Sequence, residues 1–181
     1  MKTIRSVAHI KDPYTKRILS NIINKDVFKV YSETPRLLKT LVKGLGKDQL
    51  YKPVVKGKWS IAQIISHLCD SELVMGFRYR MAISQSGSPL QAFDQNKWAN
   101  RLRYRSLDCK ARLDLFITMR RDNIALLKFL SPREWKQYGM HDERGKETIE
   151  RMVQMETGHD VSHLRQISQM RVAQLHKKSS T

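Results

Sequence analysis

The sequence predicts an all-α protein built as a four-helix bundle. Four long segments repeat apolar residues at the spacing of an α-helix, and no stretch shows the apolar–polar alternation of a half-buried strand. The connection between the second and third segments exceeds the roughly 2–8 residues that usually join neighbouring helices. With 181 residues, 40% of them hydrophobic, the chain is long and apolar enough to bury the core of one domain. Four long helices with one long crossover describe a four-helix bundle.

The first two long helices are predicted near residues 34–45 and 60–84. The first carries leucine and valine at helical spacing and is followed by two glycines, which readily end a helix. A less regular apolar stretch over residues 18–31 precedes it and is either a short helix or an arm. Ser60 and Gln63 have the spacing of a capping box, in which each side chain satisfies a backbone donor at the start of a helix. We therefore place the start of the second long helix at Ser60.

The remaining helices flank two connections. Residues 85–106 form the long crossover, whose aromatic and leucine side chains predict a short helix that packs on the body. The third long helix is expected over residues 107–130. Serine, proline and glutamate within residues 131–134 form a second capping signal, which predicts the start of a short helix. Residues 139–145 are expected to be a loop, and a threonine then suits the N-cap of a fourth long helix over residues 148–175.

These elements divide the chain into three parts. Residues 1–30 are expected to form a basic N-terminal arm or short helix, residues 31–176 the bundle, and residues 177–181 a frayed tail. No internal repeat or low-complexity block interrupts this organisation.

The charge of the chain is strongly basic, at +17 from 34 Lys+Arg against 17 Asp+Glu. Such a charge suits a nucleic-acid binder, but it also suits anionic metabolites or membrane surfaces. The basic residues are dispersed along the chain, and the densest run is the alternating segment 101–105. The interpretation that this distribution favours is a solvated basic face.

The apolar runs, the first residues and the cysteines of the sequence indicate the compartment and the redox state. No apolar run approaches the roughly 18 residues of a membrane span, and the first residues do not resemble a signal peptide. The chain contains two cysteines, Cys69 and Cys109, which are too few for a disulfide framework of the secreted type. We expect a cytoplasmic protein with no membrane association.

Three of the six histidines form a candidate metal site. His159 and His163 are spaced i,i+4 on the fourth helix, so both imidazoles lie on one face. His67 lies in the middle of the apolar second helix and, in a bundle, can face that pair. Three histidines with an open position are the arrangement of catalytic zinc. The alternatives are two polar residues on an amphipathic surface and a satisfied core histidine.

Polar residues surround the expected site on both helices. Asp70 and Arg78 lie near the face of His67, and Glu156 and Gln166 lie on the face of the other two histidines. They are candidates for a general base and for groups that orient the imidazoles. Each can equally be an ordinary helix residue that faces solvent.

Two sequence patterns together resemble the DinB-like superfamily. The first, W-S-x6-H-L-x-D-x-E, runs from Trp59 to Glu72, and the second, H-D-x-x-H-L-x-Q-I, runs from His159 to Ile167. Shorter matches lie in the crossover, at Leu130–Trp135 and around His141, so that the resemblance covers roughly residues 31–172. The chain is similar in particular to the branch of metal-dependent hydrolases and thiol S-transferases.

The resemblance implies a fold, a cofactor and a reaction class. The fold is an up-down-down-up four-helix bundle, often dimeric, with a long crossover between the second and third helices. The cofactor is one divalent metal ion per chain, zinc or nickel, and its ligands carry over onto His67, His159 and His163. The activity is hydrolysis or transfer of a low-molecular-weight thiol such as bacillithiol.

These inferences combine into one set of site predictions. The metal ligands are His67, His159 and His163, the catalytic residues are Glu156 and Asp70, and the substrate-binding residues are Arg78, Trp59 and Gln166. The expected partners are a small-molecule substrate, with a thiol as one candidate, and a second copy of the chain. The alternative hypotheses are a basic nucleic-acid-binding protein and a dimeric metal-binding scaffold without catalysis.

Overall fold

The computed structural model describes residues 3–179, with side chains described for residues 3–174. In chain order its elements are α1 (Pro13–Ser20), α2 (Val27–Val42), α3 (Lys47–Tyr51), α4 (Ile61–Ser84), β1 (Ser88–Leu90), α5 (Gln95–Arg101), the 3-10 turn η1 (Tyr104–Ser106), α6 (Cys109–Lys128), the 3-10 turn η2 (Glu134–Lys136), β2 (Tyr138–His141), β3 (Gly145–Thr148) and α7 (Ile149–Ser179).

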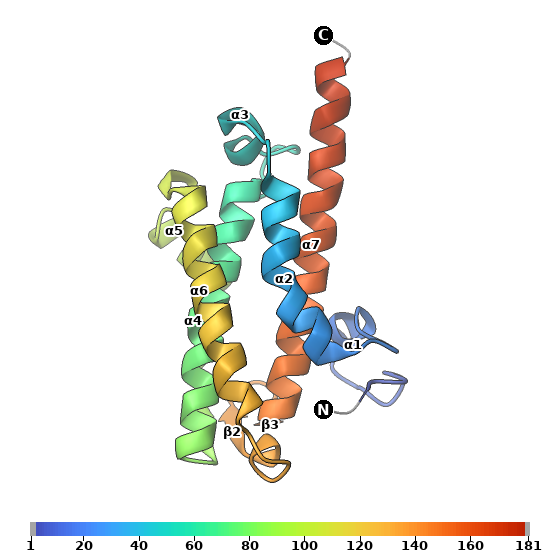
Figure 1. Cartoon of the computed structure of the whole chain (residues 1–181), viewed down its shortest axis with the longest axis vertical. Helices are drawn as coiled ribbons and strands as arrows, with labels where there is room; N and C mark the ends of the chain where they lie inside the picture. The colour runs from blue at the N-terminus through green and yellow to red at the C-terminus, as the bar shows by residue number, and fades with distance from the viewer. Residues whose placement is uncertain (1–2, 180–181) are drawn as a thin grey trace.

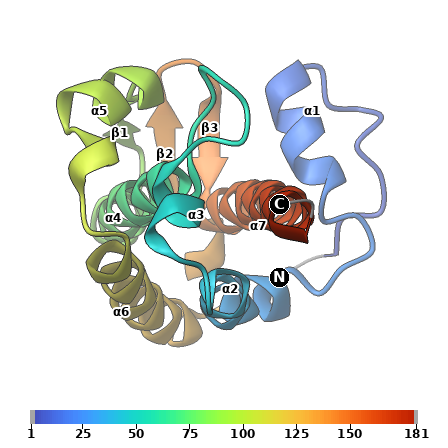
Figure 2. The same ribbon diagram turned by 90° about the horizontal axis from the view of Figure 1, so that it is seen from above.

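The four long helices α2, α4, α6 and α7 form the bundle (Figure 1). Followed along the chain, α2 rises, α4 and α6 descend and α7 rises again, so the predicted up-down-down-up topology is confirmed. Seen from above, α4 lies beside both α6 and α7, and α2 closes the other side of the bundle (Figure 2). This arrangement sets the inner face of α4 against that of α7.

The predicted helix starts are marked by caps where the sequence signal was strong. The Ser60 hydroxyl accepts the Gln63 backbone N–H at 3.3 Å, and the Gln63 side chain accepts the Ser60 N–H at 3.1 Å. The Thr148 hydroxyl accepts the Arg151 N–H at 3.1 Å and so caps α7. Because both α4 and α7 are fixed at their first turn, the residues along their facing sides have a defined register.

The start of α2 lies earlier than predicted. It begins at Val27, where the Asp26 carboxylate accepts the Lys29 N–H at 3.0 Å, and Pro35 lies inside the helix. The predicted start at residue 34 rests on the leucine and valine residues of the predicted segment, which lie in the second half of this helix. The proline is accommodated in the middle of the helix.

The expected loop over residues 139–145 is instead part of a small sheet added to the helical bundle. Strand β2 pairs with β1 in parallel and with β3 antiparallel, in the order β1-β2-β3. Strands of three or four residues are too short to display an alternating pattern, which is why the sequence did not indicate them. The sheet lies beside the lower ends of α4 and α7 (Figure 1).

Helix α7 covers most of the predicted C-terminal tail. It continues through Ser179, so only residues 180 and 181 of that tail lie outside the described residues. Within the described part of the chain, no helix combines the length and the apolar character that a membrane crossing requires.

Helix α1 lies outside the bundle, against α7 (Figure 2). The Asn21 side-chain amide donates to the Gly158 carbonyl at 3.0 Å. Gly158 permits this close approach, since a Cβ atom there would lie 2.3 Å from the Ile18 carbonyl oxygen. Because Gly158 directly precedes His159, this contact places α1 next to the candidate site.

Gly158→Ala is expected to loosen α1 from α7. The added methyl group overlaps a backbone oxygen, which cannot rotate away as a side chain does, and the helix has to shift. We expect trypsin to cleave at Lys16 and Arg17 about tenfold faster, which corresponds to a loss of about 1.4 kcal/mol in local stability. Gly46→Ala is the matched control, because its new Cβ meets only the Gln49 side chain, at 3.8 Å. Equal cleavage rates in wild type and Gly158→Ala would contradict this account.

Candidate metal centre

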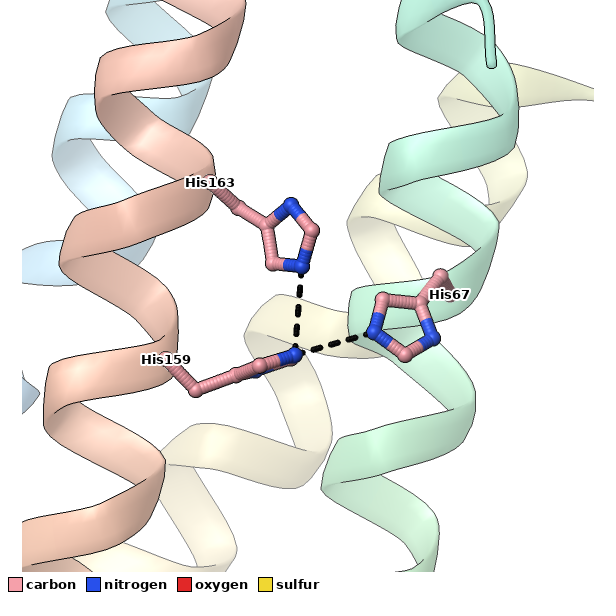
Figure 3. A group of neighbouring side chains, drawn as sticks. All are labelled: His67, His159 and His163. Carbon is pink, nitrogen blue, oxygen red and sulfur yellow. Dashed lines mark hydrogen bonds between the residues drawn. The ribbon is translucent and has the colours of Figure 1, made fainter. Parts of the chain in front are cut away.

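Three histidine side chains from two helices point at one another (Figure 3). Nε2 of His159 lies 3.0 Å from Nε2 of His67 and 3.1 Å from Nε2 of His163. His67 comes from α4, and the other two lie one turn apart on α7. The structure therefore brings together the three residues that the sequence predicts as metal ligands.

The surroundings of the three histidines keep the imidazoles neutral. Burial, followed by the proximity of His163, lowers the pKa of His67 to about 3. Burial lowers the pKa of His163 to about 4, although its bond to Gln166 acts in the opposite direction. Burial and the two neighbouring histidines lower the pKa of His159 well below its ordinary value. Neutral imidazoles offer the lone pairs that a metal ion requires.

The arrangement fits a divalent cation of the zinc type. Three nitrogens that each lie about 2.0–2.1 Å from one tetrahedral ion are about 3.3–3.4 Å apart, close to the two measured separations. Gln166 Oε1 lies 3.0 Å from Nδ1 of His163, which fixes the ring proton there and leaves Nε2 free as a ligand. The Nδ1 atoms of His67 and His159 are buried without a partner among the described residues. Nothing in this donor set conflicts with a metal held by the three Nε2 atoms.

Glu156 is the predicted catalytic residue that the structure places at the site. It is 6% exposed, and one of its oxygens lies within 4.8 Å of a ring nitrogen of His159. Burial, reinforced by the carboxylates of Asp160 and Glu72, raises the pKa of Glu156 well above its usual value. The Glu156 carboxyl can therefore hold a proton close to the histidines.

Asp70, the other predicted catalytic residue, is not brought to the histidines. Its carboxylate accepts the Tyr104 hydroxyl at 2.5 Å and forms an ion pair with Arg112 of α6. The residue one position further, Ser71, faces the cavity beside His67 instead. On a helix, the residues three and four positions after His67 both lie close to its face. Here the fourth, Ser71, faces the cavity, and the third, Asp70, does not.

Two of the three predicted substrate-binding residues lie at the histidines, and the third lies at the far end of the same cavity. The centre of the Trp59 ring is 5.2 Å from that of His67, and Gln166 bonds His163. Arg78, 7% exposed, lies further along α4 in the same cavity as His67.

Two cavities of about 390 Å³ each meet at the histidines. The first lies between α4, α7 and the small sheet and exposes His67 and His159. The second lies under Trp59 and exposes His159 and His163. Tyr14 of α1 lines both, so the N-terminal segment contributes to the walls of the site.

Several residues of these walls were missed by the sequence reasoning. Tyr14 and Arg17 lie in the N-terminal segment that was expected to be an arm or a short helix, and nothing in the sequence indicated that it returns to α7. His141, Arg144 and Glu147 line the first cavity from the hairpin that was expected to be a loop. For His141 and Arg144 a signal did exist, because both belong to the shorter matches of the family resemblance.

Comparison with known proteins assigns the fold and the family. A protein of Oceanobacillus iheyensis, named as a candidate metal-dependent hydrolase, is 28% identical over 152 residues, which cover 84% of this chain and 88% of the relative. YfiT of Bacillus subtilis, with a name of the same kind, is 24% identical over 78% of this chain and 80% of its own.

The solved structure of Bacillus subtilis YfiT superposes on 79% of this chain and 84% of its own, with a TM-score of 0.72 at 22% identity. That protein is described as a candidate metal-dependent hydrolase with an unusual four-helix bundle topology, and the likeness shows that the two folds agree. Residues 31–167, well over half of the chain, match the DinB superfamily as a whole, and the chain belongs to that superfamily.

Proposed function

We propose that this protein is a metal-dependent hydrolase whose single divalent ion, zinc or nickel, is held by His67, His159 and His163. The observation that carries the proposal is the convergence of three neutral Nε2 atoms at the meeting point of two cavities. The names of the relatives from Oceanobacillus and Bacillus support it. Imidazole ligands suit zinc and nickel among the common divalent ions.

The chain's own residues supply orientation and proton transfer. When bound, the ion acts as a Lewis acid that polarises a carbonyl or phosphoryl oxygen and lowers the pKa of water to about 7. Gln166 holds the His163 ring in the orientation that directs Nε2 inward. Glu156 holds or moves a proton beside His159. Val74, Met75 and Met152 supply apolar walls to the first cavity.

A second candidate function is transfer of a low-molecular-weight thiol to an electrophile. The observation that favours it is the pair of cavities, because each exposes a different pair of the three histidines. Two substrates can therefore approach the same centre from different sides. A thiol at a metal of this kind is deprotonated and nucleophilic.

Metal removal and reconstitution tests the proposal. The purified chain is assayed against panels of esters, amides and phosphoesters, and against electrophiles together with low-molecular-weight thiols. We expect turnover to fall more than about 100-fold on chelation and to return with zinc or nickel, since the Lewis acid supplies most of the transition-state stabilisation. Turnover that survives chelation would contradict the proposal.

The pattern across the panels separates the candidate functions. Turnover that requires the thiol would assign the transferase reaction instead of hydrolysis. A protein that is fully loaded with metal but shows no turnover in any panel would support the alternative of a metal-binding scaffold without catalysis. Steeply salt-dependent binding of nucleic acid by that inactive protein would support the alternative based on charge.

A further inference from the structure

The first cavity has a second polar centre, three helical turns from the histidines. His67, Ser71, Val74, Met75 and Arg78 line it along one face of α4. Eleven residues separate His67 from Arg78, which places their Cα atoms about 16 Å apart along the helix. Between these two ends the wall is formed mainly by apolar side chains.

Arg78 is a buried cation without a carboxylate partner. It is 7% exposed, and one guanidinium nitrogen donates to the Gln91 carbonyl at 2.5 Å. Among the ion pairs of the described side chains, none involves Arg78. A buried charge is usually paired, so an anionic ligand could bind to an unpaired arginine that faces a cavity.

Several carboxylates that line the same cavity are engaged elsewhere, and Glu156, which also lines it, lies 3.7 Å from Nη2 of Arg120. Glu147 accepts two bonds from Arg144, at 2.7 and 3.1 Å. Asp12 and Asp94, at the exposed rim, accept backbone N–H groups as the N-caps of α1 and α5. Burial lowers the pKa of Arg78, and Arg144 lowers it further, while Glu147 and Glu156 act in the opposite direction. Arg78 therefore faces the cavity with no carboxylate of the described side chains within ion-pair distance, a position that an anionic ligand could occupy.

His141 adds a second donor next to Arg78. Its Nδ1 accepts the Glu143 backbone N–H at 3.2 Å, so the proton of the neutral ring lies on Nε2. His141 pairs with Leu90 across the sheet, and Arg78 bonds the carbonyl of the next residue, Gln91. The strand pairing thus brings the two donors to the same end of the cavity.

We infer that Arg78 and His141 form an oxyanion-binding subsite, so that the substrate of the histidine centre is an elongated molecule with a carboxylate or phosphate at the end remote from the reacting bond. An apolar segment joins the two ends and contacts Val74, Met75 and Met152. This inference rests on the proposed function for the position of the reacting bond. The subsite itself rests only on the contacts of Arg78 and His141.

Binding of simple amphiphilic anions to the full, metal-loaded chain tests the subsite. Hexanoate, hexyl phosphate and the neutral hexanol are titrated calorimetrically into wild type and Arg78→Met, with metal content measured in both. We expect Arg78→Met to weaken binding of at least one anion about 10- to 100-fold, the worth of a charge-assisted hydrogen bond, and to leave hexanol binding and metal content unchanged. The anion that binds tighter to wild type identifies the terminal group.

The matched control is Arg80→Met on the same helix, because Arg80 is an exposed arginine that pairs with Asp122 outside the cavity. It should bind both anions as wild type does. If Arg78→Met does not fold, Arg78→Lys keeps the charge without the planar fork and should weaken binding several-fold. Anion binding that is unchanged in the folded Arg78 variant would place the anion at the metal and overturn the inference.

Failure of the subsite and failure of the proposed function give different results. Binding is measured without turnover, so Arg78-dependent binding by an inactive protein would retain the subsite and reject the hydrolase. Metal-dependent hydrolysis together with anion binding that does not depend on Arg78 would retain the hydrolase and reject the subsite.

Discussion

His159→Ala is expected to abolish metal binding. The His159 Nε2 atom is the one that contacts both other ligand atoms, at 3.0 and 3.1 Å, so its loss leaves His67 and His163 without the group between them. Loss of a group that merely supports a ligand usually costs 10- to 100-fold in metal affinity, and loss of a ligand should exceed about 100-fold. The measurement is elemental analysis of the purified proteins, with about one ion per chain expected in wild type from the three-ligand open site and almost none in the variant.

The matched control is His9→Ala, which removes an exposed histidine of the N-terminal segment. It should retain the wild-type metal content. Thermal melts of both variants after chelation separate loss of the ligand from loss of the fold. Equal metal content in wild type and a folded His159→Ala would rule out the centre assigned to the three histidines.

The long helices could be predicted because each has signals within its own sequence, such as apolar spacing and capping residues. The capping box at Ser60 and Gln63 and the threonine before α7 act over one turn of the chain, and such local signals are readable in a sequence. The small sheet was missed because its strands are held by pairing between distant segments, such as Leu90 with His141. Pairing of that kind leaves little trace in a run of three or four residues.

The site was predictable to the extent that helical spacing determines it. His159 and His163 share a face through their spacing alone, whereas the approach of His67 depends on α4 lying beside α7, which a four-helix bundle permits but does not require. The choice between Asp70 and Ser71 could not be made from the sequence, because the difference depends on where Tyr104 and Arg112 lie. The contribution of α1 depends on the contact at Gly158, which only the folded chain reveals.

Arg120→Met is expected to destabilise the protein by about 3–5 kcal/mol, because it leaves buried carboxylates without their cation. Arg120 of α6 is fully buried and bonds Glu72 of α4 at 2.7 Å and Asp160 of α7 at 2.6 Å. Burial alone would lower the pKa of Arg120, but Asp160 and Glu72 outweigh it and raise the pKa well above its usual value. The charge is therefore retained in the core because carboxylates surround it, including that of Glu156, 3.7 Å from Nη2 of Arg120.

The same arginine also explains how α2 tolerates a proline. Pro35 has no N–H to donate to the carbonyl four residues earlier, that of Tyr31. Arg120 Nη1 donates to this carbonyl at 3.0 Å, and its guanidinium lies 3.8 Å from the centre of the Tyr31 ring. Arg120 thus bonds all three of the other long helices, and its loss should affect the register of α4 against α7.

Urea unfolding at neutral pH measures the effect of Arg120→Met, with Arg121→Met as the matched control. Arg121 is the next residue on α6 and is exposed, so its replacement should change the free energy of unfolding by no more than about 0.5 kcal/mol. Adding Glu72→Gln and Asp160→Asn to Arg120→Met removes the two carboxylates that lie nearest to the arginine and should recover part of the loss. Equal stability of the two single variants would show that the buried cluster does not hold the helices together. A loss in Arg120→Met that the added substitutions do not reduce would trace the effect to packing around Tyr31 rather than to charge.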